Sequence, residues 1–516
     1  MENYNKGAIM PEKFSLCVCD KKLGGESAEE FTLPDYRPEI RKLLSITPTF
    51  TPPSVYSAGG RLELGGNVCY LVTYCGEDGG LYSVDLTSSY NFDTEVAQDS
   101  CVDTSEGVRV LADVTADSVT GRVIAPRKIS VRTKMSCYVR AYAPAQLDVC
   151  ITGLEDDSTL RQLMGQASCA EIIKCDKQGI VMTDQVIPQQ KEGELRVIGR
   201  DGRVFVGEAT SANGCVMCRG ELILKLMICR EQGGEPECIV RKLPFTQEIA
   251  AMGVAPGYEC RAWGDCTEVK VSIEDGRLDC EALMTLEAEA QRRIDFNYVK
   301  DIYSTDASSE VAYTQKTLTL PLRAANGNFT QSGVFEAAEA GLPAGARIID
   351  ADGYATPHSV TAEDGRCVVT GEARYNVLYV DGEEYGCREL VSPLRYETDL
   401  GGEVADGELD ASVCMTVFGC RVRMDGERVS VDSEIGVALR LCCPVQVRML
   451  SEACFAGTSQ RRCGDVVVCY PDEGDTLWSV ARRYGADAQR ICANNSLKVG
   501  SPDDRASLSG ADFLII

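Results

Sequence analysis

GGNVCYLVTYC (residues 65–75), RGELILKLMIC (219–229) and TGEARYNVLYV (370–380) share one pattern, a glycine followed by a run of strand-forming residues. Aligned on this glycine, the three stretches lie 154 and 151 residues apart. The aligned glycines are Gly66, Gly220 and Gly371. Because self-similarity at a nearly fixed spacing marks a repeated structural unit, the sequence predicts three copies of one β-rich unit.

Two further landmarks keep this spacing. An aromatic residue lies 25 or 26 positions after each glycine, at Phe92, Phe245 and Tyr396. A later strand-like stretch starts 58 or 63 positions after it, at Ile129, Leu278 and Val429. Upstream, a Leu-Pro or Ile-Pro pair ends at Pro34 and Pro188, each 32 residues before the glycine, whereas the third copy has its pair at Pro321, 50 residues before it. The third copy is therefore expected to carry an insertion near 326–345.

Within each copy, apolar residues alternate with polar ones or form short runs, and turns such as EDGG, EQGG and VDGEE separate them. This pattern is typical of strands joined by hairpins. It predicts a mainly β protein, with one antiparallel sandwich or open barrel per repeat. Two short helices are expected within this framework, at 37–45 (RPEIRKLLS) and 158–166 (STLRQLMGQ).

The composition limits the function. The chain has 516 residues and a net charge of −26, so several domains are expected, and its field repels nucleic acid and anionic membrane surfaces. We expect no nucleic-acid partner and no membrane insertion, since no export signal or apolar stretch of about 20 residues is recognised. The 26 cysteines are then expected to be reduced, mostly as small buried hydrophobes.

Few residues are suited to catalysis. His358 is the single histidine, and it stands in an expected turn without a positioned nucleophile or orienting partner. Cys215 and Cys218 form one C-x-x-C pair, which alone cannot complete a four-ligand zinc site. No phosphate-binding loop or dinucleotide fingerprint is present. We therefore expect a binding or structural protein without enzymatic activity, cofactor or metal.

The pattern changes after residue 465. A strand is expected at 466–470, and Asp475 is expected to cap a helix by accepting the N–H groups of Leu477 and Trp478. The apolar stripe of this helix consists of Leu477, Val480, Ala481 and Tyr484. Gly485 is expected to end it. A second helix is expected to begin at Asp487, with Ala488, Ile491 and Cys492 facing inward, and FLII (513–516) supplies a closing strand.

This strand-helix-helix-strand order, with GDTLWSVARRYG followed by ANN, resembles a LysM domain. The resemblance implies a sugar-binding groove between the loop after the first strand and the loop after the second helix. The groove residues it implies are Glu473, Gly474, Asp475, Thr476, Leu477, Asn494, Asn495, Ser496, Leu497 and Lys498. Leu477, Trp478, Val480 and Ile491 are expected to form the domain core whatever the domain binds.

Tandem β-rich repeats ahead of a C-terminal LysM domain resemble the clostridial spore-coat morphogenetic proteins of the SipL type, whose repeats are called SPOCS domains. That family implies a non-enzymatic adaptor in the mother-cell cytoplasm, at the surface of the forespore and spore coat. Its LysM domain would dock onto the ATPase of the coat basement layer, sporulation stage IV protein A, with other coat proteins as further partners. The docking surface would be an exposed edge of Glu473, Asp475 and Thr476 with the loop near Asn495.

The alternative is a wall-associated protein that binds peptidoglycan or chitin-type polymers of N-acetylglucosamine. An enzyme acting on the wall is the least favoured hypothesis. A secondary hypothesis assigns the thiols to coat cross-linking once the surroundings become oxidising. The predicted division is an N-terminal segment (1–30), three β repeats (31–165, 166–300 and 301–455), a linker (456–464) and the LysM domain (465–516).

Overall fold

The computed structural model describes residues 14–96, 108–145, 150–152, 157–188, 195–230, 235–402, 404, 406–457, 467–497, 501–504, 508 and 512–516. These residues form strands almost throughout, with two α-helices of eight residues each near the C-terminus. The predicted mainly β class is confirmed. Among the described residues, no helix has the length and apolar character needed to cross a membrane.

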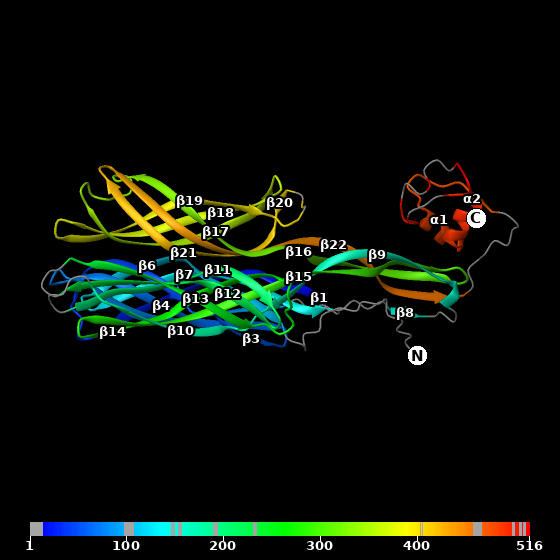
Figure 1. Ribbon diagram of the computed structural model, residues 1–516. Coiled ribbons are helices and arrows are strands. Elements are labelled where there is room, and N and C mark those ends of the chain that lie inside the picture. Colours follow the sequence, from blue (N-terminus) through cyan, green and yellow to red (C-terminus); the bar gives the residue numbers. More distant parts are fainter. Residues whose placement is uncertain are drawn as a thin grey trace.

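The strands pair into sheets with one recurring order (Figure 1). In unit 1, one sheet is β1 (Phe14–Thr32), β7 (Lys128–Ala145) and β6 (Arg109–Ala125); the other is β2 (Ile40–Phe50), β4 (Arg61–Gly76) and β3 (Ser54–Ala58), with β5 (Leu81–Glu95) also on β4. In unit 2 the sheets are β10 (Gln178–Val186), β15 (Arg277–Ser304) and β14 (Glu259–Glu274), and β11 (Leu195–Ala212), β12 (Cys215–Arg230) and β13 (Glu237–Ala250). In unit 3 they are β16 (Ser308–Glu336), β22 (Arg428–Ala456) and β21 (Asp410–Asp425), and β19 (Glu384–Asp399), β18 (Arg366–Asp381), β17 (Arg347–Glu363) and β20 (Gly407–Glu408).

The aligned glycines occupy one structural position. Each is the sixth residue of a 16-residue strand, β4, β12 or β18. A Cβ on Gly220 would lie 2.0 Å from the carbonyl oxygen of Phe205, and a Cβ on Gly371 would lie 2.1 Å from that of Thr356. In both units the partner strand has a bulge close to this point. The glycine is therefore required because a bulged backbone crosses directly over it.

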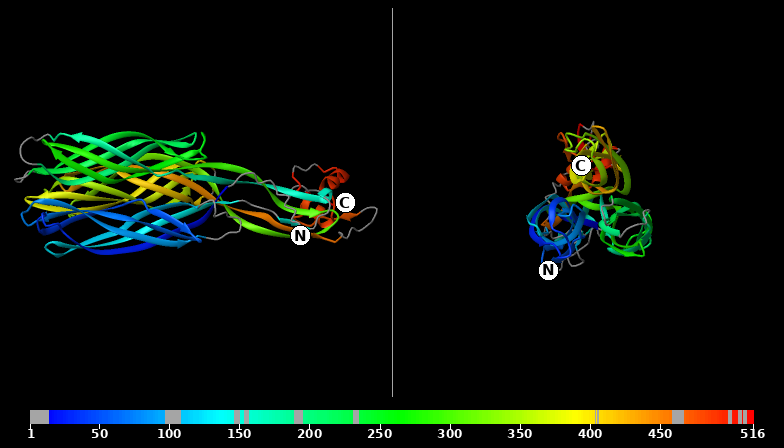
Figure 2. Two further views of the ribbon diagram at one scale, coloured as in Figure 1. Left: turned by 90° about the horizontal axis from the view of Figure 1, so that it is seen from below. Right: turned by 90° about the vertical axis from the view of Figure 1, so that its left-hand side faces the viewer.

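The three units lie side by side (Figure 2), and each encloses its own apolar core between its two sheets. Buried residues, most of them apolar, alternate along the strands with exposed polar ones, as in β5, whose even-numbered positions face inward. This alternation is what places one face of each sheet on the core.

A narrower stalk extends from one end of the three units (Figure 1). β9 (Leu160–Lys174) pairs with the last part of β15, and the first part of β16 pairs with the last part of β22, which β8 (Cys150–Thr152) joins in parallel. Between the two layers lie the buried residues Val299, Ile302, Leu450, Ala453 and Phe455. The stalk thus consists of the chain segments that connect one unit to the next, and a 3-10 turn (Asp157–Thr159) lies ahead of β9.

Several expectations are corrected. The segments expected as helices near residues 40 and 160 belong to strands β2 and β9, because neighbouring strands outcompete the weak helical periodicity of a nine-residue stretch. The expected insertion in the third copy does not exist. Pro321 lies inside β16, and that strand ends at Glu336, 35 residues before Gly371, just as β1 ends 34 residues before Gly66.

Two further positions differ from expectation. β1 begins at Phe14 and pairs with β7 along its whole length, so the sheet starts well ahead of residue 31, and the boundary drawn at 165–166 falls inside β9. His358 is exposed, but it lies in β17 rather than in a turn, at a register shift between Pro357 and Ser359. The bulge lets its side chain project to solvent.

Candidate functional site

The C-terminal domain is built as a two-stranded sheet covered by two helices. β23 (Val468–Cys469) pairs antiparallel with β24 (Leu514–Ile515), and the helices are α1 (Leu477–Tyr484) and α2 (Ala488–Asn495). Val466, the expected start of the first strand, lies outside the described residues. The apolar core contains Cys469, Leu477, Trp478, Val480, Ala481, Ile491, Leu508 and Leu514. The predicted core of this domain is therefore confirmed.

The cap of α1 differs from the prediction by one residue. Thr476, not Asp475, is the N-cap: its hydroxyl accepts from the Ser479 amide (3.1 Å), and its own amide donates to the Ser479 hydroxyl (2.9 Å). This is a reciprocal capping box. Thr476 has β-region backbone angles, which the N-cap position needs, and this places Asp475 just before it.

Asp475 instead holds the preceding turn together. Its carboxylate accepts from the Asp472 amide (3.0 Å), the Ser479 hydroxyl (3.0 Å) and the Arg483 guanidinium (2.7 Å). Desolvation would raise the pKa of Asp475, but these hydrogen bonds hold it below its ordinary value. The side chain is 9% exposed, so it is not a free ligand group.

The helix ends follow the sequence signals more closely. Gly485 adopts the left-handed conformation (φ 57°) after α1, and Asp487 caps α2 by accepting from the Gln489 amide at 2.8 Å. Both expectations are confirmed. Tyr484, expected on the apolar stripe, is the last residue of α1 and is 36% exposed.

Leu477 of the first expected groove loop is part of the apolar core of this domain, and Leu497 of the second packs against that core. The residues left exposed along the two loops are Glu473, Gly474, Asn494 and Ser496. Thr476 is buried. Of the predicted exposed edge of Glu473, Asp475 and Thr476, only Glu473 is therefore fully exposed. Lys498 lies outside the described residues.

Asn495, expected in the second loop, is instead the last residue of α2 and has a structural role. Its amide nitrogen donates to the carbonyl oxygens of Ile491 (2.8 Å) and Ile515 (2.7 Å), and its oxygen accepts from the Ile515 amide (2.7 Å). The side chain thereby ties the end of α2 to β24 and has little capacity left for a ligand. Across the groove, the Trp478 amide donates to the Pro502 carbonyl (2.9 Å), so residues 501–504 rest on the start of α1.

The domain is fixed to the stalk through Asp301 of β15. The carboxylate accepts from the Trp478 indole N–H (2.8 Å), the Tyr313 hydroxyl (2.7 Å) and the Arg482 guanidinium (2.7 and 2.9 Å). Trp478 and Arg482 are four residues apart, so both project from one side of α1. We call this contact the LysM joint.

Further contacts surround the LysM joint. The Tyr303 ring meets Trp478 edge-on (centroids 4.8 Å apart), and its hydroxyl donates to the Ala486 carbonyl (2.7 Å). Arg161 of β9 pairs with Asp487 at 2.7 Å, and Lys300 pairs with Asp503. Sequence reasoning missed this joint, because its stalk residues lie in a segment that carries no motif.

The outer face of the two-stranded sheet remains uncovered within the part of the chain that the structure describes. Val468 is 48% exposed, Tyr470 73% and Phe513 51%. Cys469 and Leu514, which alternate with them, face the helices and are buried. This domain thus offers two separate surfaces, the groove loops and this apolar sheet face.

Other candidate chemistry is weak. Among the described residues, no three His, Cys, Asp or Glu side chains are placed to hold a metal ion. Cys215 and Cys218 are both buried free thiols, and burial raises the pKa of Cys218 to about 12, so it is unreactive at neutral pH. A cavity of about 420 Å³ between units 1 and 2 is lined in part by Lys174 and Lys177, but both ammonium groups already pair with Glu287.

The comparisons bear on this C-terminal domain alone. The family model for the LysM domain matches residues 472–503. Neither the search of the curated proteins nor that of the solved structures finds a match to the chain. The matched span covers both helices and the exposed residues Glu473, Gly474 and Asn494. LysM domains are associated with binding peptidoglycan and related N-acetylglucosamine glycans. The C-terminal domain is therefore a LysM domain.

Proposed function

We propose that this chain is a non-enzymatic scaffold whose LysM domain binds an N-acetylglucosamine polymer such as peptidoglycan at the end of the stalk. The observation that supports it most is the division of surfaces on the LysM domain. The stalk contacts one side of α1, the α1–α2 loop and Asp503, whereas Glu473, Gly474, Asn494 and Ser496 stay exposed along the groove. A polymer could reach the groove without displacing the stalk.

Titration of the full chain with chitin oligomers, followed by calorimetry, tests this proposal. Glu473→Ala combined with Asn494→Ala removes exposed polar groups from both groove loops, and we expect at least tenfold weaker binding. Gln489→Ala is the matched control, because Gln489 is exposed on α2 and, five residues before Asn494, projects from another side of the helix. Wild-type protein that binds neither chitin oligomers nor peptidoglycan would rule the proposal out.

A second candidate is the adaptor suggested by the resemblance to coat morphogenetic proteins, with stage IV protein A as the partner of the LysM domain at the forespore surface. The apolar sheet face favours it, because a contiguous exposed patch with two aromatic rings is typical of protein contacts. On this hypothesis the chain works in the mother-cell cytoplasm.

The two candidates are separated by variants on different surfaces. Tyr470→Ala with Phe513→Ala should abolish co-purification with the ATPase and leave sugar binding unchanged. The groove variant should do the reverse. Binding of the ATPase that survives loss of both aromatic rings would contradict docking through the sheet face.

A further inference from the structure

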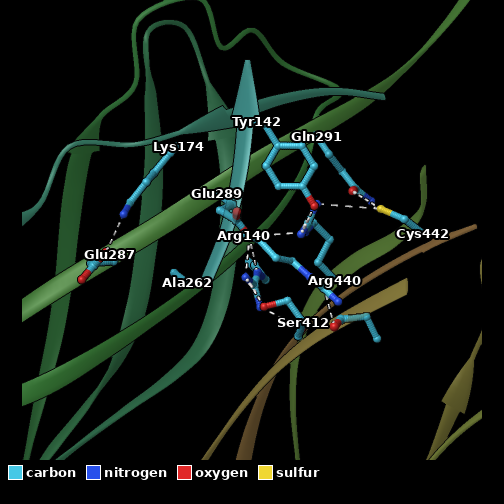
Figure 3. A network of polar contacts seen from close by, with 12 residues as sticks. Arg140, Tyr142, Lys174, Ala262, Glu287, Glu289, Gln291, Ser412, Arg440 and Cys442 are labelled. Carbon is cyan, nitrogen blue, oxygen red and sulfur yellow. Dashed lines mark hydrogen bonds and ion pairs between the residues drawn. The ribbon is translucent and has the colours of Figure 1, made fainter. Parts of the chain in front are cut away.

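Three equivalent positions meet where the units touch. They are Arg140, Glu289 and Arg440. Each lies eleven residues after the landmark of the shared strand in its own unit, which is Ile129, Leu278 or Val429. One unit thus supplies an acid where the other two supply an arginine. Figure 3 shows these side chains converging from β7, β15 and β22.

Glu289 lies at the centre of this contact. Its carboxylate accepts from Arg261 of its own unit (2.5 Å) and lies 3.6 Å from the guanidinium of Arg440 of unit 3. All three side chains are 1% exposed. Desolvation would raise the pKa of Glu289, but the two guanidiniums more than offset this and hold it below its ordinary value. The carboxylate is therefore ionised in the folded protein at neutral pH.

The same groups reach all three units. Arg440 donates to the Tyr142 hydroxyl of unit 1 (2.7 Å) and stacks over that ring, with 4.9 Å from the guanidinium carbon to the ring centroid. Arg261 donates to the carbonyl and hydroxyl oxygens of Ser412 in unit 3 (2.8 and 2.9 Å). Each link therefore crosses from one unit to another.

The third equivalent residue makes a different link. Arg140 of unit 1 pairs with Asp410 of unit 3 at 2.9 Å and donates to the Ala411 carbonyl at 2.6 Å. Arg140 of unit 1 therefore faces Asp410 of unit 3 and not Glu289 of unit 2. Arg140 and Arg440 thus each pair with a carboxylate of another unit, although Arg140 also pairs with Asp20 of its own unit at 3.2 Å.

Identical copies could not make this arrangement. Three arginines or three glutamates at equivalent positions would repel one another in a site of low dielectric. Burying the charges is also costly, and among the described residues Glu289 Oε1 and Arg440 Nε make no hydrogen bond. Buried ionic groups of this kind are weak sources of stability, and their best-attested role is to specify an arrangement.

We propose that Arg140, Glu289 and Arg440 act as a charge code that sets which unit lies against which, and that prevents a unit from pairing with the wrong unit of another chain. Glu289 needs a neighbour with an arginine at this position, and units 1 and 3 both carry one. Asp410 of unit 3 pairs with Arg140, which leaves Arg440 to face Glu289. The partner that this surface fits is thus a specified unit of the same chain. Without the code, a unit of one chain could pack against a non-equivalent unit of another chain, which would produce mixed-chain dimers.

Hydrogen exchange across a urea series on the full chain tests the first half of this proposal. In the wild type we expect β4, β12 and β18 to lose protection at one shared midpoint. Arg440→Met should give β18 a lower midpoint than β4 and β12, because unit 3 loses the contacts of Arg440 with Glu289 of unit 2 and Tyr142 of unit 1. Arg428→Met is the matched control on the same strand, since its pair with Glu336 is exposed (side chains 75% and 53%). A shared midpoint in Arg440→Met would overturn the proposal.

A second variant tests specificity apart from stability. Arg261→Met, Glu289→Leu and Arg440→Met together replace the buried charges with apolar groups, a change that folded proteins often accept. After refolding a mixture of two isotope-labelled preparations, we expect at least ten times more mixed-chain dimers than for the wild type, counted by native mass spectrometry. An equal number of mixed dimers in variant and wild type would overturn the charge code.

Discussion

The centre of the three units and the LysM joint use the same chemical trio, an arginine, a carboxylate and a tyrosine hydroxyl. At the centre, Arg440 meets Glu289 and donates to Tyr142 at 2.7 Å. At the LysM joint, Arg482 meets Asp301 and donates to the hydroxyl of Tyr313 at 3.2 Å. Burial separates them, because the charged side chains are 1% exposed at the centre but 32% and 13% exposed at the joint.

This difference determines what each trio can do. At the centre, water cannot replace a lost partner. Removal of any one of the three groups therefore leaves a buried charge or donor without its partner and destabilises the contact. At the LysM joint water reaches the guanidinium, so the contact can be broken at modest cost. The chain therefore uses one set of groups for a permanent contact and for a separable one.

The largest effect is expected from Glu289→Ala. It leaves the guanidiniums of Arg261 and Arg440 buried without their carboxylate, which should lower the free energy of unfolding by about 3–5 kcal/mol. Urea denaturation followed by circular dichroism measures this. Glu336→Ala, on an exposed pair, should cost less than about 1 kcal/mol. Equal losses would contradict the contrast between buried and exposed pairs.

The two tyrosines allow a closer comparison. Tyr142→Phe removes an acceptor from a fully buried arginine and should cost about 1–3 kcal/mol. Tyr313→Phe makes the same chemical change at the LysM joint and should cost less than about 1 kcal/mol, because solvent can satisfy Arg482. The same denaturation series measures both, and a larger loss for Tyr313→Phe would reverse the assignment of the two sites.

A smaller effect is expected from Asp301→Asn. The amide has the same shape as the carboxylate but carries no charge to attract Arg482. The contact between the LysM domain and the stalk should therefore weaken by about 1 kcal/mol. Hydrogen exchange at α1 should rise, and added salt should raise it in the wild type as well, because the pair is partly exposed. Protection in β15 next to Glu289 should not respond to salt. Salt-insensitive exchange at α1 would count against a separable joint.

The smallest effect concerns pH. Desolvation and the carboxylates of Asp113 and Glu287 raise the pKa of Asp265 to about 7, but the residue is exposed to solvent, which screens these charges and reduces the effect on stability. In the unfolded chain its pKa is about 3.9. Between roughly pH 4 and pH 7 the folded protein therefore holds a proton that the unfolded chain lacks, and stability falls as pH rises through this window.

Asp265→Asn should reduce the fall of stability with rising pH between roughly pH 4 and pH 7. Melting temperatures of the variant and the wild type from pH 4 to pH 8 give the comparison, and parallel curves would contradict the shifted pKa. Glu289 has the opposite sign: its pKa is lowered, so its contribution is present above the unfolded value of about 4.3 and is lost as pH falls through the folded value.

Much of this fold could be predicted from periodicity and spacing. The glycines at 66, 220 and 371 marked equivalent strands because a bulge over Gly220 and Gly371 excludes any side chain, a constraint that a sequence displays directly. The LysM helices were recognisable because caps and turns are local. The strands β2 and β9 were mistaken for helices because their pairing partners are remote in sequence.

The charged contacts were harder to predict. Asp301 meets Trp478 across 177 residues of chain, and Arg440 meets Tyr142 across 298, so nothing local marks them. Alignment of the repeats at Ile129, Leu278 and Val429 did contain one signal, an arginine, a glutamate and an arginine at the same offset. Such a change of charge at an otherwise repeated position indicates contact between copies.

The route of the chain through the stalk also sets an order of events during synthesis. Ser308 pairs with Ala456, and Cys150 lies beside Glu452, so the ribosome must deliver about 450 residues before the stalk can close. Pairings between strands this remote in sequence form slowly. The segment that follows unit 1, which includes β8, therefore stays unpaired until β22 has been made. The LysM domain follows the last stalk strand in the chain, so the platform that holds it is completed only just before the domain itself is made.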